Sequence, residues 1–182
     1  NLWDASSPFQ DIRVRQAMQM ALDLDTISKT YFRGYADPTP FGIVGPAVIG
    51  YYVPFAEWPA SLKETYTYNV DKAKQLIKDA GHANGFTTHL LVASNFALLD
   101  VDYAQILKGY WAKIGVTVNI DVVEQGALWG QVYTHTYQGM TFGIRGMDYD
   151  PLVYLRYWGG HSTSPFNSHG LDAKFDSLIE AA

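Results

Sequence analysis

The sequence predicts an α/β fold. Residues 87–93 and 116–123 each have the apolar, β-branched character of a strand, and residues 100–114 between them carry apolar side chains at helical spacing. A strand, a helix and a second strand in succession form a parallel βαβ unit. The chain has 182 residues, of which 48% are hydrophobic and 17% charged, which is enough apolar material to bury one core. We therefore expect residues 1–182 to form a single α/β lobe.

Two helices are predicted near the N-terminus. The first follows Pro8 and the potential cap Asp11, and its apolar residues recur at i, i+3, i+4 and i+7. This apolar stripe consists of Val14, Ala17, Met18 and Ala21. Asp25 is expected to cap a second, shorter helix that ends at Gly34, because glycine readily adopts the left-handed backbone that stops a helix.

Residues 37–59 are rich in proline and glycine and show no period, which predicts a long irregular loop. Such loops are usually functional, so contact of this loop with a partner protein stays open as one hypothesis. The next helix is predicted to begin after the cap Asn69 and to stop at Gly81.

The second half of the chain continues the α/β pattern. Residues 116–122 alternate between apolar and polar side chains, which predicts a strand with one buried face and one exposed or edge face. A helix is expected around residues 128–133, a third strand over 140–144, and a helix that opens at Pro151. The last helix is predicted over residues 171–182. Aromatic residues at core spacing are expected to pack inside, namely Tyr103, Trp111 and Trp129.

Composition excludes several classes of function. The chain has 13 Lys and Arg against 18 Asp and Glu, a net charge of −5, and no basic patch, so nucleic acid is not an expected partner. No stretch approaches the roughly 18 apolar residues of a membrane span, and the N-terminal residues do not resemble a signal peptide. The absence of cysteine excludes disulfides, thiolate zinc sites and thiol nucleophiles.

The best candidate site is the segment Asp148-Tyr149-Asp150, which follows a predicted strand and precedes a helix. In α/β proteins this is a common place for ligands. Two alternatives stay open here: Asp150 either takes part in binding or only caps the helix, and Arg145 pairs either with a ligand carboxylate or with Asp148. Trp158, beside two glycines, is the candidate aromatic contact.

Evidence for catalysis is thin. The tight carboxylate pairs are Asp148 with Asp150 and Asp23 with Asp25, but side chains two residues apart in a turn seldom face each other across a substrate. A hydrolase that uses Asp148 and Asp150 is the rival class. The five histidines show neither an i, i+4 pair nor an HExxH motif, so no metal site is expected. The sequence also lacks a P-loop, a Gly-x-Ser-x-Gly elbow and a GxGxxG motif, so we expect no catalytic residues and no cofactor.

Several segments, taken in order, resemble the family 5 extracellular solute-binding proteins. The likeness covers nearly the whole chain and is more specific as an ordered set than any one motif. The segments are residues 8–17 running into 21–25, 34–36, 68–77, 80–81, 85–86, 111–116, 148–151, Asn167 and 175–179.

The resemblance implies a fold and a function. It implies a type II periplasmic-binding-protein-like lobe with a mixed sheet and flanking helices, similar to domain 3 of the dipeptide-binding proteins. Such a lobe is the second large lobe of a two-lobed protein, so this chain is expected to be a fragment of a longer one. The implied function is the substrate-binding component of an ABC importer. It holds a ligand between two closing lobes without catalysis and delivers it to a membrane permease. The implied location is periplasmic or extracellular, either free or tethered by a lipid.

The same resemblance assigns the candidate binding residues. In peptide binders of the family an acidic residue takes the ligand's amino group, and Asp148 matches it by position. The sequence departs from the family pattern, since Arg145-Gly146-Met147 replaces the usual tryptophan and the segment before Pro151 is one residue shorter. The expected ligand is a peptide, and the alternative is an oligosaccharide stacked on Trp158. The full set of expected ligand contacts is Arg145, Met147, Asp148, Tyr149, Asp150, Trp158 and Asn167.

Overall fold

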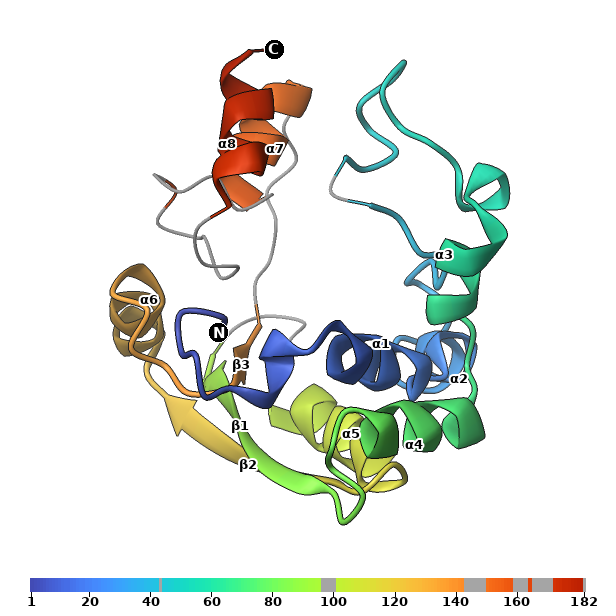
Figure 1. The fold of residues 1–182 in the computed structure, drawn as a ribbon, viewed down its shortest axis with the longest axis vertical. Coiled ribbons are helices and arrows are strands. Elements are labelled where there is room, and N and C mark those ends of the chain that lie inside the picture. The colour runs from blue at the N-terminus through green and yellow to red at the C-terminus, as the bar shows by residue number, and fades with distance from the viewer. Residues whose placement is uncertain (43, 96–100, 143–149, 159–163, 165–171, 182) are drawn as a thin grey trace.

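A three-stranded parallel sheet lies between layers of helices (Figure 1). The computed structural model describes residues 1–42, 44–95, 101–142, 150–158, 164 and 172–181. The strand order is β2-β1-β3, with β1 at Phe86–Ala93, β2 at Val116–Val123 and β3 at Met140–Thr141. β1 pairs with β2 along its whole length and with β3 through Leu90 and Leu91.

The predicted βαβ unit is confirmed. Helix α5, Val101–Ala112, connects β1 to β2 and buries Ala104, Leu107 and Trp111 on the sheet. The expected mixed sheet is not what the described strands form, because both of their pairings are parallel. The third strand is also shorter than expected, since it ends at Thr141 and Phe142 lies outside it. Residues 143–149 lie outside the described part of the chain.

The main core lies on the face of the sheet that α5 covers, together with three more helices. These are α1 at Ile12–Met20, α2 at Leu24–Thr30 and α4 at Val70–Asp79. A short 3-10 turn, η1 at Pro8–Gln10, leads into α1 and buries Phe9. The most deeply buried large side chains of this core are Val14, Met20, Leu90, Val92, Val116 and Val118.

The N-terminal ends of the helices in this layer follow the predicted capping residues with one exception, and α2 ends at Thr30, before the predicted stop at Gly34. The Asp11 carboxylate caps α1, and Asn69 caps α4 by accepting from the backbone of Lys72. The second helix is capped by Asp23, which accepts from the backbone of Thr26 at 3.0 Å, and not by Asp25. Asp25 instead lies in the first turn, where a negative charge is favourable near the positive end of the helix dipole.

The opposite face of the sheet is only partly covered. Helix α6, Gln125–Tyr133, packs Leu128 and Val132 against Leu91 of β1. On β2 the residues Thr117 and Asn119 are exposed while their neighbours Val116 and Val118 are buried. This alternation confirms the predicted edge strand, because β2 is the outer strand of the described sheet.

The described residues of segment 37–59 are irregular as predicted, apart from a 3-10 turn, η2 at Phe55–Glu57, and the segment leads into α3 at Ala60–Thr65. Helices α7, Pro151–Trp158, and α8, Ala173–Glu180, pack on each other. Figure 1 shows these two helices and the 37–59 segment rising on the same side of the body formed by the sheet and α1. None of the described helices is long and apolar enough to cross a membrane.

Candidate functional site

The carboxyl ends of the strands define the candidate site. Because β1, β2 and β3 run parallel, the residues that follow them gather at one edge of the sheet, which is where open α/β sheets bind ligands. In Figure 1 the ends of β1 and β3 point toward the side on which α7 and α8 lie. The described polar residues at this edge are Ser94, Asn95, Glu124 and Thr141.

Ser94 and Asn95 follow β1 directly, and both are exposed. The Ser94 amide donates to the Val123 carbonyl at 2.9 Å, which extends the β1–β2 ladder by one bond and fixes the backbone at the strand end. Neither side chain has a hydrogen-bond partner among the described residues, so both can donate to and accept from a ligand. Sequence analysis missed these two residues, although their place just past a predicted strand was the available signal.

Two carboxylates lie at the starts of the helices α6 and α7. Glu124 caps α6 by accepting from the amides of Gly126 at 2.8 Å and Ala127 at 3.3 Å. Asp150 accepts from the Leu152 amide at 2.8 Å at the start of α7, which Pro151 opens as predicted. The capping alternative for Asp150 is therefore confirmed, and its contact with a ligand stays a prediction.

The other predicted site residues fall outside what the structure describes. Arg145, Met147, Asp148, Tyr149 and Asn167 lie within residues 143–149 and 165–171, which are not described. Trp158 is the last residue of α7, but its side chain is not among those described. Their assignment to the site therefore stays a prediction, as does that of Asp150.

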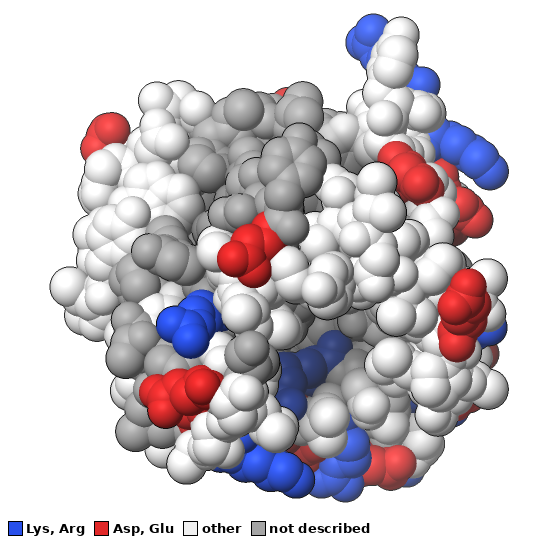
Figure 2. Space-filling model, turned by 90° about the horizontal axis from the view of Figure 1, so that it is seen from above, with Lys and Arg blue, Asp and Glu red and all other residues white. Residues whose placement is uncertain are grey.

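A second feature near the sheet is a pair of neighbouring cavities along α1. The first has a volume of about 260 Å³ and mostly apolar walls: it is lined by Asn1, Leu2, Phe9, Arg15, Met18, Gln19, Leu22, Trp111 and Met140. The second, about 350 Å³, shares Gln19 and Leu22 with the first and extends to Tyr66, Tyr103 and the start of the proline-rich loop. Figure 2 shows the molecule from above the view of Figure 1, with charges of both signs scattered around a hollow that has Lys or Arg atoms on its floor.

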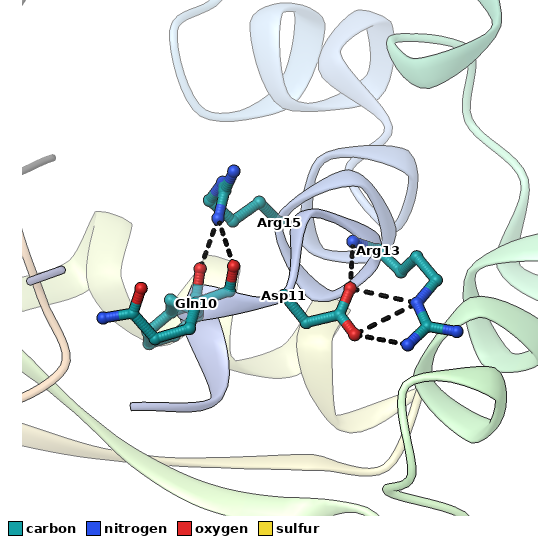
Figure 3. A network of polar contacts seen from close by, with 5 residues as sticks. Gln10, Asp11, Arg13 and Arg15 are labelled. Atoms are coloured by element: carbon teal, nitrogen blue, oxygen red, sulfur yellow. Dashed lines mark hydrogen bonds and ion pairs between the residues drawn. The ribbon is translucent and has the colours of Figure 1, made fainter. Parts of the chain in front are cut away.

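The N-terminal end of α1 carries a network of charged side chains (Figure 3). Arg13 contacts the Asp11 carboxylate with its Nε and Nη2, the latter at 2.5 Å, and these bonds lower the pKa of Asp11 to about 2. Arg15 instead donates from Nη1 to two backbone carbonyls, those of Phe9 at 2.5 Å and Gln10 at 3.1 Å. In Figure 3 the two arginine side chains lie on different sides of the chain.

The described histidines lie apart from one another. His89 Nδ1 contacts Asp121 Oδ2 at 2.7 Å across the β1–β2 pair, and His135 stacks on Trp3 with ring centroids 4.7 Å apart. Burial lowers the pKa of His135 below its ordinary value. In the part of the chain that the structure describes, no group of three His, Cys, Asp or Glu side chains is placed to hold a metal ion.

Comparisons with known proteins agree with this architecture. Residues 1–166 match the family of bacterial extracellular solute-binding proteins, family 5 Middle. The glutathione-binding protein GsiB of Pectobacterium atrosepticum is 34% identical over 119 residues, which are 65% of this chain and 21% of that protein. The heme-binding protein A of Haemophilus influenzae is 27% identical over 189 residues, covering 97% of this chain and 31% of that protein.

Solved structures show the same fold. The periplasmic binding protein DppA of Helicobacter pylori, in complex with the peptide STSA, superposes on 97% of this chain with a TM-score of 0.76 and 25% identity. The chain covers 33% of that protein, so it spans about a third or less of the length of these relatives. The match over residues 1–166 and the shared type II periplasmic-binding fold together show that the chain belongs to the family 5 bacterial extracellular solute-binding proteins.

Proposed function

We propose that this chain is one lobe of the substrate-binding component of an ABC importer and that its ligand is a peptide. The main support for this proposal is the fold match to a periplasmic binding protein in complex with the peptide STSA. This match extends over 97% of the chain. The glutathione-binding relative, whose name also denotes a peptide-like ligand, supports the same class. Because the chain spans a third or less of these relatives, the second lobe, the permease and the ligand are all parts of this proposal.

The ligand would lie against the carboxyl edge of the sheet. Ser94 and Asn95 would supply hydrogen bonds there, and Asp148, which follows β3 in sequence, would accept the ammonium of the peptide's first residue. The second lobe would then close over this edge and remove the ligand from water. Closure strengthens each charged contact, since a low-dielectric surrounding screens it less.

In this proposal the protein binds its ligand without chemical change. The carboxylates of Glu124 and Asp150 both serve as helix caps, so each is already committed to backbone amides. This arrangement favours binding over a hydrolase that would use Asp148 with Asp150. A hydrolase would turn over a peptide or glycoside in the full-length protein and would lose that activity in Asp148→Asn.

A thermal-shift screen of the full-length protein tests the ligand class. Di- to pentapeptides, oligosaccharides and metal chelates are each added at saturating concentration, because a ligand that binds only the native state stabilises it by about 2.7 kcal/mol at 100 times its Kd. The proposal expects the melting temperature to rise with peptides. A rise with oligosaccharides alone would replace the peptide by a sugar and make Trp158 the first residue to substitute.

A further inference from the structure

The outer side of β2 is a long strand edge that no described strand covers. β2 runs from Val116 to Val123 and pairs with β1 in unbroken register along its whole length. It is the outer strand of the described sheet (Figure 1), and helix α6 packs on β1. Its 8 residues exceed the mean strand length of about five to six. Such an edge offers a row of backbone donors and acceptors to another strand.

This edge carries few of the features by which proteins keep strand edges from pairing. Those features are proline, β-bulges and charged side chains, above all lysine. Residues 116–123 contain neither proline nor lysine, and Asp121 is their one charged residue. The carboxylate of Asp121 is held on its own sheet, because its Oδ2 contacts His89 Nδ1 at 2.7 Å. The pairing with β1 has no bulge that would twist the edge away. The edge is therefore open to a further strand.

The backbone groups on this edge belong to the even-numbered residues of β2. The Gly115 carbonyl accepts from the Phe86 amide at 3.3 Å, and the Val123 carbonyl accepts from the Ser94 amide at 2.9 Å. Backbone groups of alternate residues point to the same side of a strand, so the odd-numbered residues bond to β1. The residues whose N–H and C=O groups point away from β1 are Val116, Val118, Ile120 and Val122.

A second, antiparallel copy of β2 fits this edge in one register. Residues with outward backbone groups must face each other, because they form the hydrogen-bonded pairs of an antiparallel ladder. The register that pairs all four of these residues within the strand has its two-fold axis at Asn119 and sets Val118 opposite Ile120 of the second copy. On the exposed face Thr117 then lies opposite Asp121 of the second copy.

The side chains that meet in this register are complementary. The Thr117 hydroxyl donates to the Asp121 carboxylate of the other copy, and the two-fold axis repeats this contact. The two Asn119 amides face each other, and an amide both donates and accepts. Neither Thr117 nor Asn119 has a side-chain hydrogen bond to another described residue, and both are exposed. Val122, which is 48% exposed, comes to lie opposite Val116. No like charges face each other.

We propose that the outer edge of β2 binds a second copy of the protein, antiparallel and about a two-fold axis at Asn119. The sheets of the two copies then form one continuous sheet. The contact runs along the side of the sheet and leaves its carboxyl edge open, so this inference goes beyond the proposed function and does not depend on it. A contact along one strand is smaller than a standard interface of about 1,600 Å², so the dimer forms at high protein concentration.

The test is sedimentation-velocity ultracentrifugation of the full-length protein over a series of concentrations. The wild-type protein is expected to shift from monomer toward dimer as its concentration rises. Thr117→Asp sets two carboxylates opposite each other at two symmetric positions and is expected to raise the Kd of the dimer about tenfold. Thr117→Lys sets a cation opposite Asp121 at the same positions and is expected to lower this Kd. A charge that only disturbed the strand would weaken the dimer in both variants.

Thr87 provides the matched control. It is an exposed threonine that pairs with Thr117 from β1, one strand away from the edge. Thr87→Asp and Thr87→Lys are therefore expected to leave the Kd of the dimer unchanged. A wild-type protein that stays monomeric at every concentration overturns the inference, whether or not it binds peptides. A dimer that weakens in both Thr117 variants contradicts the register, and a dimer that neither variant changes forms through another surface. Each of these two results also overturns the inference.

Discussion

The indole Nε1 of Trp111 donates a 3.0 Å hydrogen bond to the backbone carbonyl of Met18, and this buried bond joins α5 to α1. Met18 lies in the last turn of α1, where carbonyls have no partner within the helix. The neighbouring Met20 carbonyl is satisfied in the same way, by the amide of Asn69 at 2.9 Å. The C-terminal end of α1 is therefore closed by groups from two other parts of the core.

The first prediction concerns this bond. Trp111→Phe is expected to lower the free energy of unfolding by about 1 to 3 kcal/mol, because the buried Met18 carbonyl loses its donor and part of the ring volume is removed. Trp58→Phe is the matched control, since Trp58 Nε1 donates to the Val53 carbonyl at 3.0 Å in a more exposed place where water can replace it. Urea unfolding of both variants measures the difference. Equal losses would show that the Trp111 bond has no special role in joining the helices.

The second prediction separates the two acidic residues at the start of α2. Asp23→Ala is expected to cost about 1 kcal/mol, because both carboxylate oxygens contact Thr26, through its amide at 3.0 Å and its hydroxyl at 2.7 Å. Asp25→Ala removes only a favourable charge in the first turn and is expected to cost less. Thermal unfolding of the two variants measures both losses of stability. A larger loss of stability in Asp25→Ala than in Asp23→Ala would contradict the observed cap.

The third prediction concerns the close approach of two glycines where β1 and β2 begin. Gly85 has a φ of +75°, and a Cβ there would lie 1.9 Å from the Gly115 carbonyl oxygen. Gly85→Ala is therefore expected to destabilise the fold by more than about 1 kcal/mol. Gly109→Ala, in α5 with open space around its Cβ, is expected to stabilise by about 0.5 to 1 kcal/mol. Opposite signs in urea unfolding support this geometry, and a neutral Gly85→Ala speaks against it.

The fourth prediction is a pH dependence that arises at Asp11. Its hydrogen bonds from Arg13 lower the folded-state pKa to about 2, below the value of about 4 in the unfolded chain. The ionised carboxylate therefore stabilises the fold above about pH 4, and this stabilisation is lost as the pH falls toward 2. An NMR titration is expected to show the pKa of Asp11 rising toward its ordinary value in Arg13→Gln. A pKa that does not move would rule out Arg13 as the cause.

Much of the fold was predictable because local patterns and tertiary packing agree. The alternation that begins at Val116 predicted an edge strand, and the spacing of Ala104, Leu107 and Trp111 predicted the buried face of α5. The predicted capping residue of α2, Asp25, was wrong. Asp23 and Asp25 have the same chemistry, and the residue at which the helix begins depends on how the helix packs on the core. The parallel pairing of β3 with β1 could not be derived from a strand of two described residues.

The candidate site was less accessible to sequence analysis than the fold. Asp150 was predicted both as a ligand contact and as a cap, and the Leu152 amide confirms the cap. The sequence did not indicate a structural contact for Arg15, because a charged residue on the polar side of a helix normally faces water. Its side chain is held by the carbonyls of Phe9 and Gln10 and lines a cavity together with Trp111 from a distant helix. Contacts of this kind are set by the tertiary fold and leave no local pattern.

The most direct test of the central claim is the affinity of the full-length protein for one peptide with a free amino group and for its N-acetylated form. Both are measured by calorimetry on wild type and on Asp148→Asn, with Asp25→Asn as a control outside the site. We expect that acetylation abolishes binding to wild type and to the control, and that Asp148→Asn binds both forms equally weakly. Equal binding of the free and acetylated peptides by the wild-type protein would contradict the assignment of Asp148 as the acceptor of the peptide's amino group.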